Sequence, residues 1–175
     1  MTLAQNRRDN IDFTVDHLVS VHGVYCIICE LEDECCISVG SLGKAKFRRG
    51  AYVYVGSAQQ GIEQRGDRHR SNKKKHKWHI DYFLGEADVK AVIAVPSEVK
   101  ETECKLAKAI LAIPGASAPI SGFGSSDCGC DSHLAYLGDE GLESASESVV
   151  YHLSMLGCMY PEKMTDASRR GRKRR

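Results

Sequence analysis

Two short segments, each with a tyrosine close to a glycine among β-branched residues, constrain the fold of this chain most. They are residues 23–29, GVYCIIC, and residues 51–55, AYVYV, which Gly56 ends. This composition is typical of buried β-strands. An acidic turn at residues 32–34 follows the first segment and predicts a hairpin, with residues 35–39 as the returning strand. The sequence therefore predicts a β-sheet built from segments early in the chain.

Helices and further strands follow later in the chain. We place the domain itself at residues 21–138, after a polar arm (1–20) and before a C-terminal extension (139–175) with an acidic linker, a short helix and a basic tail. A hairpin first and helices later favours an α+β fold, a small and mainly antiparallel sheet flanked by helices. The local patterns predict a short helix over residues 78–84, a strand over 89–95, a helix from 97 to about 111, a strand over 133–137 and a helix over 149–156.

The composition is that of an ordinary globular domain, with 42% hydrophobic and 27% charged residues. It excludes a mainly disordered or collagen-like chain. No run of 18 apolar residues is present, which excludes a transmembrane helix. Residues 1–13 lack the apolar core of a signal peptide. We therefore expect a soluble, cytoplasmic protein that has no membrane partner.

Glu103 stands at the N-terminal end of an apolar stripe on a predicted helix. The stripe follows at three, four, seven and eight residues beyond it, with Leu106, Ala107, Ile110 and Leu111. A carboxylate on such a face is costly unless it is paired or binds a metal ion. A glutamate in the first turn can instead favour the helix macrodipole and reach water. The spacing alone leaves both interpretations open.

Taken in order, these residues resemble the GIY-YIG nuclease superfamily. The resemblance rests on Gly23-Val24-Tyr25, then Tyr54-Val55-Gly56, then Arg65 with His69 four residues later, then Glu103 on a helix. Residues 52–58, 78–82 and 122–128 are similar to one branch of that superfamily. That branch is catalogued as a domain of unknown function, is common in archaea and is sometimes fused to an endonuclease-III-type glycosylase. The resemblance covers residues 23–136.

The resemblance implies a three-stranded antiparallel sheet flanked by helices, and metal-dependent hydrolysis of phosphodiester bonds in DNA. It implies that Glu103 holds one divalent ion, Mg²⁺ or Mn²⁺, which a hard carboxylate oxygen suits. Tyr25 would be the general base, and Tyr54 would orient water or phosphate. Arg65 would grip the scissile phosphate through its fork of donors, and His69 would share proton transfer or hold a phosphate. The expected partner is duplex or branched DNA, without a small-molecule cofactor.

A basic block lies between the second tyrosine segment and the predicted helix at 78–84. Residues 65–77 contain seven basic residues and one acid, and six of the last seven residues, 169–175, are basic. Such a block fits the rim of a nucleic-acid site, although a solubilising loop has the same composition. We expect the residues that contact nucleic acid to be Arg68, Arg70, Lys73, Lys74, Lys75 and Lys77.

One departure from the family pattern supports a different function. Active members usually carry an asparagine late in the domain, whereas the asparagines of this chain are Asn6, Asn10 and Asn72. The alternative is a nucleic-acid-binding module that keeps the fold and the basic rim but does not cut. A third interpretation is an interaction domain that uses the acidic segment 140–147 and the basic tail.

Cys128, Cys130 and His133 place three metal-capable side chains within six residues. A structural zinc site usually has two to four residues between paired cysteines, so this spacing favours an inert, packed pair over zinc. A further zinc ligand would have to come from elsewhere, such as Cys26 or Cys158. Free cysteine is commonly buried as a small hydrophobe, and we expect this of Cys26, Cys29, Cys35 and Cys36.

Overall fold

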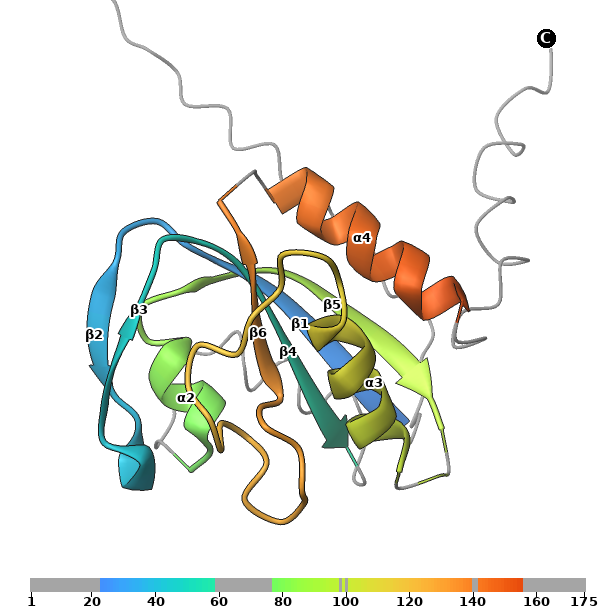
Figure 1. The fold of residues 1–175 in the computed structure, drawn as a ribbon, viewed down its shortest axis with the longest axis horizontal. Coiled ribbons are helices and arrows are strands. Elements are labelled where there is room, and N and C mark those ends of the chain that lie inside the picture. Colours follow the sequence, from blue (N-terminus) through green and yellow to red (C-terminus); the bar gives the residue numbers. More distant parts are fainter. Residues whose placement is uncertain (1–22, 59–76, 98, 100, 140–141, 156–175) are drawn as a thin grey trace, which may run out of the picture.

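The computed structural model describes residues 23–58, 77–97, 99, 101–139 and 142–155. Within them the main sheet has four strands in the order β5-β1-β4-β6, and every neighbouring pair is antiparallel (Figure 1). These strands are β1 (Gly23–Leu31), β4 (Gly50–Ala58), β5 (Asp88–Pro96) and β6 (Leu134–Gly138). A second sheet pairs β2 (Cys35–Ser38) with β3 (Lys44–Phe47), and the helices are η1 (Gly40–Leu42), α2 (His79–Phe83), α3 (Thr102–Leu111) and α4 (Leu142–Met155).

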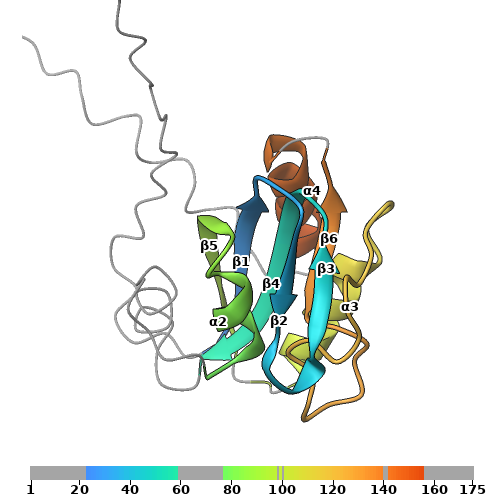
Figure 2. The ribbon, with the colours of Figure 1, turned by 90° about the vertical axis from the view of Figure 1, so that its left-hand side faces the viewer.

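The main sheet is covered on both faces. The β2–β3 pair and α2 lie on one side, and they face the viewer in Figure 2, while α3 and α4 lie on the other side. Strand β1 is buried along almost its whole length, which explains its continuous apolar sequence, because a strand between two layers has no solvent face. Tyr25, Ile27 and Cys29 belong to the core on the α2 side. Val24 and Cys26 belong to the core on the α3 side.

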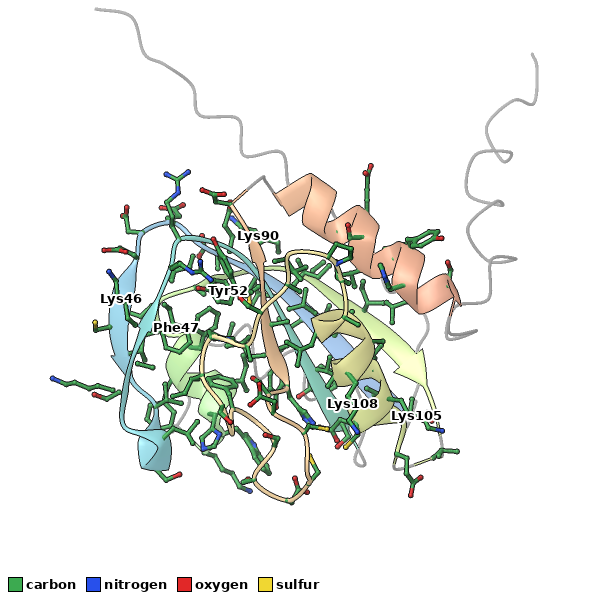
Figure 3. The ribbon with its side chains drawn as sticks, viewed as in Figure 1. Lys46, Phe47, Tyr52, Lys90, Lys105 and Lys108 are labelled. Atoms are coloured by element: carbon green, nitrogen blue, oxygen red, sulfur yellow. The ribbon has the colours of Figure 1, made fainter. Side chains whose placement is uncertain are left out.

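An aromatic layer holds the β2–β3 pair and α2 against the sheet. The ring centroid of Phe83 from α2 lies 5.1 Å from that of Phe47 and 4.8 Å from that of Tyr52. Figure 3 labels Phe47 and Tyr52 in this layer. The Tyr52 hydroxyl donates to the Arg48 carbonyl over 2.6 Å, so its polar end is satisfied. Burying each ring contributes about 1.5–3 kcal/mol.

Helices α3 and α4 form the other core. The predicted stripe is confirmed, since Leu106, Ala107 and Ile110 of α3 are buried together with Val149 and Leu153 of α4. Helix α4 begins at Leu142, inside the segment expected as an acidic linker, and so is longer than predicted. None of the helices in the described part of the chain is long and apolar enough to cross a membrane.

The predicted hairpin between residues 23–29 and 35–39 is wrong. Strand β1 pairs with β4 and β5, whereas β2 pairs with β3 in the second sheet. The physical reason is burial: β2 has only Ile37 fully buried, so it cannot fill a place that is covered on both faces, whereas β4 is apolar along most of its length. Cys26 and Cys29 are buried as expected, whereas Cys35 is only half-buried and Cys36 is exposed, contrary to expectation.

The remaining predicted elements are confirmed with shifted ends. The short helix is α2, and the late strands are β5 and β6. Helix α3 starts at Thr102 rather than at residue 97, and the Ser97 and Thr102 hydroxyl oxygens lie 2.7 Å apart across the turn that leads into it. The main sheet has four strands, one more than the resemblance implied, because β6 adds to the outer side of β4.

Candidate functional site

The two tyrosines of the sequence motif lie side by side on adjacent strands. Tyr25 of β1 is directly opposite Gly56 of β4, and its ring centroid lies 6.4 Å from that of Tyr54. A Cβ atom on Gly56 would lie 2.6 Å from the Tyr25 hydroxyl oxygen and 2.9 Å from Cε1 of Tyr54. Any side chain there would displace a ring, so Gly56 is required for this pairing of tyrosines.

A second glycine brings the loop before β6 onto Tyr54. Gly124 has a φ of +72°, and a Cβ atom there would lie 2.9 Å from Cε2 of Tyr54 and 3.1 Å from Cβ of His133. The Gly124 N–H donates to Nδ1 of His79 on α2 over 3.1 Å. The loop therefore packs closely between Tyr54, His79 and His133.

Glu103 lies in the first turn of α3 and is paired with His133. Its Oε1 atom is 3.2 Å from Nδ1 of the imidazole, and its side chain is 21% exposed whereas that of His133 is 2% exposed. Burial lowers the pKa of His133, but the hydrogen bond and the negative charge of Glu103 raise it, and the net pKa lies above the usual value. Both sequence interpretations of Glu103 thus hold in part, because the carboxylate is paired and also reaches water.

A group of sulfur and nitrogen atoms lies on the other side of the same imidazole. The Sγ atoms of Cys104, Cys128 and Cys130 and one ring nitrogen of His133 all lie within 4.8 Å of one another. The Cys128 Sγ is 3.4 Å from Nε2 of His133. Sequence reasoning missed Cys104. Of the two further ligands that it suggested, Cys26 lies in the apolar core beneath α3, and Cys158 lies outside the described residues.

The thiols of this group differ in acidity. Burial raises the pKa of Cys104 to about 12, and hydrogen bonds to the other two thiols add to the rise. Burial also opposes ionisation of Cys128, but hydrogen bonds from Cys130 and Cys104 and the nearby His133 outweigh it, so its pKa lies below the usual value. Cys128 is therefore the member of the group most ready to become a thiolate, the form that binds metals.

The structure brings some of the predicted site residues together and does not describe others. Tyr25 contacts Tyr54, Tyr54 contacts the Gly124 loop, and His133 links that loop to Glu103. The exposed Lys77 lies two residues before α2, with its ammonium 5.2 Å from the centroid of the Trp78 ring. The predicted residues that lie outside the described part of the chain are Arg65, His69, Arg68, Arg70, Lys73, Lys74 and Lys75.

A family model matches most of the chain. The sequence model of a family described as "Domain of unknown function DUF123" matches residues 24–155. Neither the curated proteins nor the solved structures contain a match to this chain. The matched range includes both tyrosines, Glu103, and the cysteine and histidine group.

Proposed function

The chain belongs to the DUF123 family, whose function is unknown, and on the geometry of its tyrosine pair we propose that it is a metal-dependent endonuclease of the GIY-YIG type. Its reaction is the hydrolysis of phosphodiester bonds in DNA. The observation that carries the proposal is the pairing of Tyr25 with Gly56 across β1 and β4, beside Tyr54. Two glycine–tyrosine motifs far apart in the sequence meet in one antiparallel register, as a shared site requires.

Each side chain of the proposed site has a separate role in hydrolysis. In its phenolate form, the Tyr25 oxygen takes the proton of the attacking water and becomes the hydroxyl, and Tyr54 orients that water or the phosphate. A free tyrosine titrates near 10, so a base at neutral pH needs a positive charge beside it. In this proposal either Arg65 or the bound metal ion would supply that charge, and Arg65 would grip the scissile phosphate with its fork of donors.

Glu103 is suited to hold one Mg²⁺ or Mn²⁺. Its side chain is partly exposed, and His133 engages its Oε1 atom, which leaves Oε2 for a cation. Mg²⁺ is commonly bound through one or two carboxylates and keeps several waters, so a single carboxylate fits it. When bound, the ion neutralises charge on the phosphate and lowers the pKa of a bound water.

The decisive experiment is a cleavage assay on the full chain with Mg²⁺, with Mn²⁺ and with a chelator. The substrates are branched, nicked and plain duplex DNA. Glu103→Gln should abolish metal-dependent cleavage with the fold intact, because it removes the ligand charge and keeps the volume. The matched control is Glu101→Gln, which removes a charge from an exposed residue at the same helix end. Wild-type cleavage by Glu103→Gln would overturn the proposal.

A second candidate function is a nucleic-acid-binding module without cleavage. It is favoured by the asparagines, which occur only at positions 6, 10 and 72, so residues 73–175 offer no amide of the kind that active members carry late in the domain. The same assay separates the two functions. DNA binding that persists in every metal condition, with no cut ends, identifies the module.

A further inference from the structure

We propose that Cys104, Cys128, Cys130 and His133 bind one Zn²⁺ in a closed structural site, with Glu103 as the outer carboxylate on His133. The zinc ligands are distinct from the Mg²⁺ or Mn²⁺ ligand of the proposed nuclease, although Glu103 borders both positions through its two oxygen atoms, and the zinc proposal does not depend on that function. It joins the first turn of α3 to the loop between Gly122 and β6.

The donor set and its dimensions fit zinc. Three thiolates and one imidazole form one of the common structural zinc sets, usually tetrahedral. With Zn–S near 2.3 Å and Zn–N near 2.0–2.1 Å, two neighbouring ligand atoms on one tetrahedral ion lie about 3.6 Å apart. The Cys128 Sγ and His133 Nε2 atoms are 3.4 Å apart, and all four donors lie within 4.8 Å of one another. The donors are therefore already gathered, and binding needs only small side-chain shifts.

The imidazole gives an independent indication of a metal. Zinc-bound histidines almost always donate the other ring N–H to a carboxylate, a carbonyl or water, and this contact fixes the tautomer. In His133 the Nδ1 atom lies 3.2 Å from Oε1 of Glu103, and Nε2 faces Cys128. One nitrogen thus meets a carboxylate and the other meets sulfur, which is the order found in a carboxylate–histidine–zinc series.

The charge around the group also fits a bound dication. Three thiolates with one Zn²⁺ leave a net charge of −1, since the imidazole is neutral. Lys108 follows Cys104 by four residues on α3 and therefore lies on the same side of the helix. Figure 3 shows Lys105 and Lys108 on this helix. A nearby ammonium stabilises the negatively charged site.

The site would add metal–ligand bonds to a loop that is otherwise held by hydrogen bonds and by packing against Tyr54 and His79. Between α3 and β6 the described chain has no regular helix or strand, and residues 124–133 are mostly turns and bends. Only Phe123 anchors this segment as a fully buried large apolar side chain. Three of the four proposed ligands lie in this loop, and Cys104 ties it to a helix that is packed in the core.

The test measures zinc in the full chain, without reference to cleavage. Elemental analysis after dialysis should find one zinc per chain, and Co²⁺ in its place should show the thiolate charge-transfer and visible bands of a tetrahedral site. Cys104→Ser should lose stoichiometric zinc, whereas Cys36→Ser, at an exposed thiol outside the group, should keep it. Glu103→Gln should weaken zinc in chelator competition about 10–100-fold, and Glu101→Gln should not.

Several outcomes would overturn this inference. One is a wild-type chain that binds no zinc when Zn²⁺ is supplied under reducing conditions. Another is a Cys104→Ser chain with unchanged zinc affinity. The inference would also be overturned if peptide mapping found a disulfide between two of the three cysteines in protein that had been prepared with reductant and Zn²⁺. If a variant does not fold, competition for Zn²⁺ on the wild-type chain still decides the matter.

Discussion

Gly124→Ala should destabilise the fold through two effects that can be separated within this chain. The φ of +72° places the residue in the left-handed region, which costs an L-residue about 1–2 kcal/mol. The new methyl group would also meet the ring of Tyr54 at 2.9 Å and Cβ of His133 at 3.1 Å, and overpacking of this kind costs about 1–3 kcal/mol. Alanine also reduces the freedom of the unfolded chain, which returns about 0.4–1 kcal/mol. The expected loss is about 1–4.5 kcal/mol, centred near 3 kcal/mol.

Two further glycines provide the controls. Gly115 has a φ of +83° with no atom near its Cβ position, so Gly115→Ala should show the backbone effect alone, a loss of about 1 kcal/mol. Gly129, in the same loop as Gly124, has neither a positive φ nor a close neighbour, so Gly129→Ala should be neutral or slightly stabilising.

The assay is unfolding in urea or guanidinium followed by circular dichroism, with equal m-values required for comparison. The three variants should rank Gly124→Ala, Gly115→Ala and Gly129→Ala in order of decreasing loss. If Gly124→Ala lost no more stability than Gly115→Ala, the contact of the loop with Tyr54 and His133 would have no energetic weight. The loop would then contribute nothing to holding Tyr54 in place beside Tyr25.

The remaining predictions concern chemistry, metal and charge. Tyr25→Phe should lower single-turnover DNA cleavage by about 10²–10⁴ with little change in affinity, because general acid–base assistance is worth about that much; Tyr54→Phe should lose less, and an undiminished rate for Tyr25→Phe would refute its role as base. Removing zinc with a chelator should lower the melting temperature, because a ligand at 1,000 times its dissociation constant stabilises a fold by about 4 kcal/mol; Zn²⁺ and not Mg²⁺ should restore it, and an unchanged melting temperature would contradict this. In the metal-free chain at pH 8, alkylation of Cys104 should be slower than that of the exposed Cys36, because burial raises the pKa of Cys104 to about 12; peptide mass spectrometry measures both, and equal rates would contradict it. Deleting residues 169–175, six of which are basic, should flatten the salt dependence of DNA binding by about 0.9 for each phosphate that the shortened chain no longer neutralises; a salt slope equal to that of the full chain would show that these residues do not bind DNA.

Periodicity predicted the parts of the fold whose signal is local. The α3 stripe, β5 and β6 follow from apolar spacing, and the buried run of β1 follows from its composition. The hairpin prediction failed because a turn at 32–34 is a short-range signal, whereas the partner of β1 is decided by which strand can be buried on both faces. Which strand can be buried on both faces depends on the tertiary structure and cannot be predicted from a local turn signal.

The candidate site was predictable in its residue types but not in its contacts. Motif order proposed Tyr25, Tyr54 and Glu103 as site residues, and the structure places Gly124 against Tyr54 and Cys104 beside His133. Cys104 lies 24 positions before Cys128, on a helix whose apolar stripe carries no information about sulfur. The pairing of Glu103 with His133 is equally long-range, so neither contact could be found by spacing.

The position of β1 in the main sheet has a consequence for synthesis on the ribosome. This strand emerges before all its neighbours, yet it occupies an interior position between β5 and β4. When only β1 has left the exit tunnel, the nascent chain exposes an apolar strand whose two hydrogen-bonding edges have no partner strand. Such edges invite association with other chains. Its second partner, β5, arrives about 60 residues later, and β6 then covers the outer edge of β4. Because His133 immediately precedes β6, the imidazole that pairs with Glu103 is among the last parts of the domain to be synthesised. Pulse-labelling hydrogen exchange on stalled chains should find the β1 amides that face β5 unprotected until β5 has left the exit tunnel.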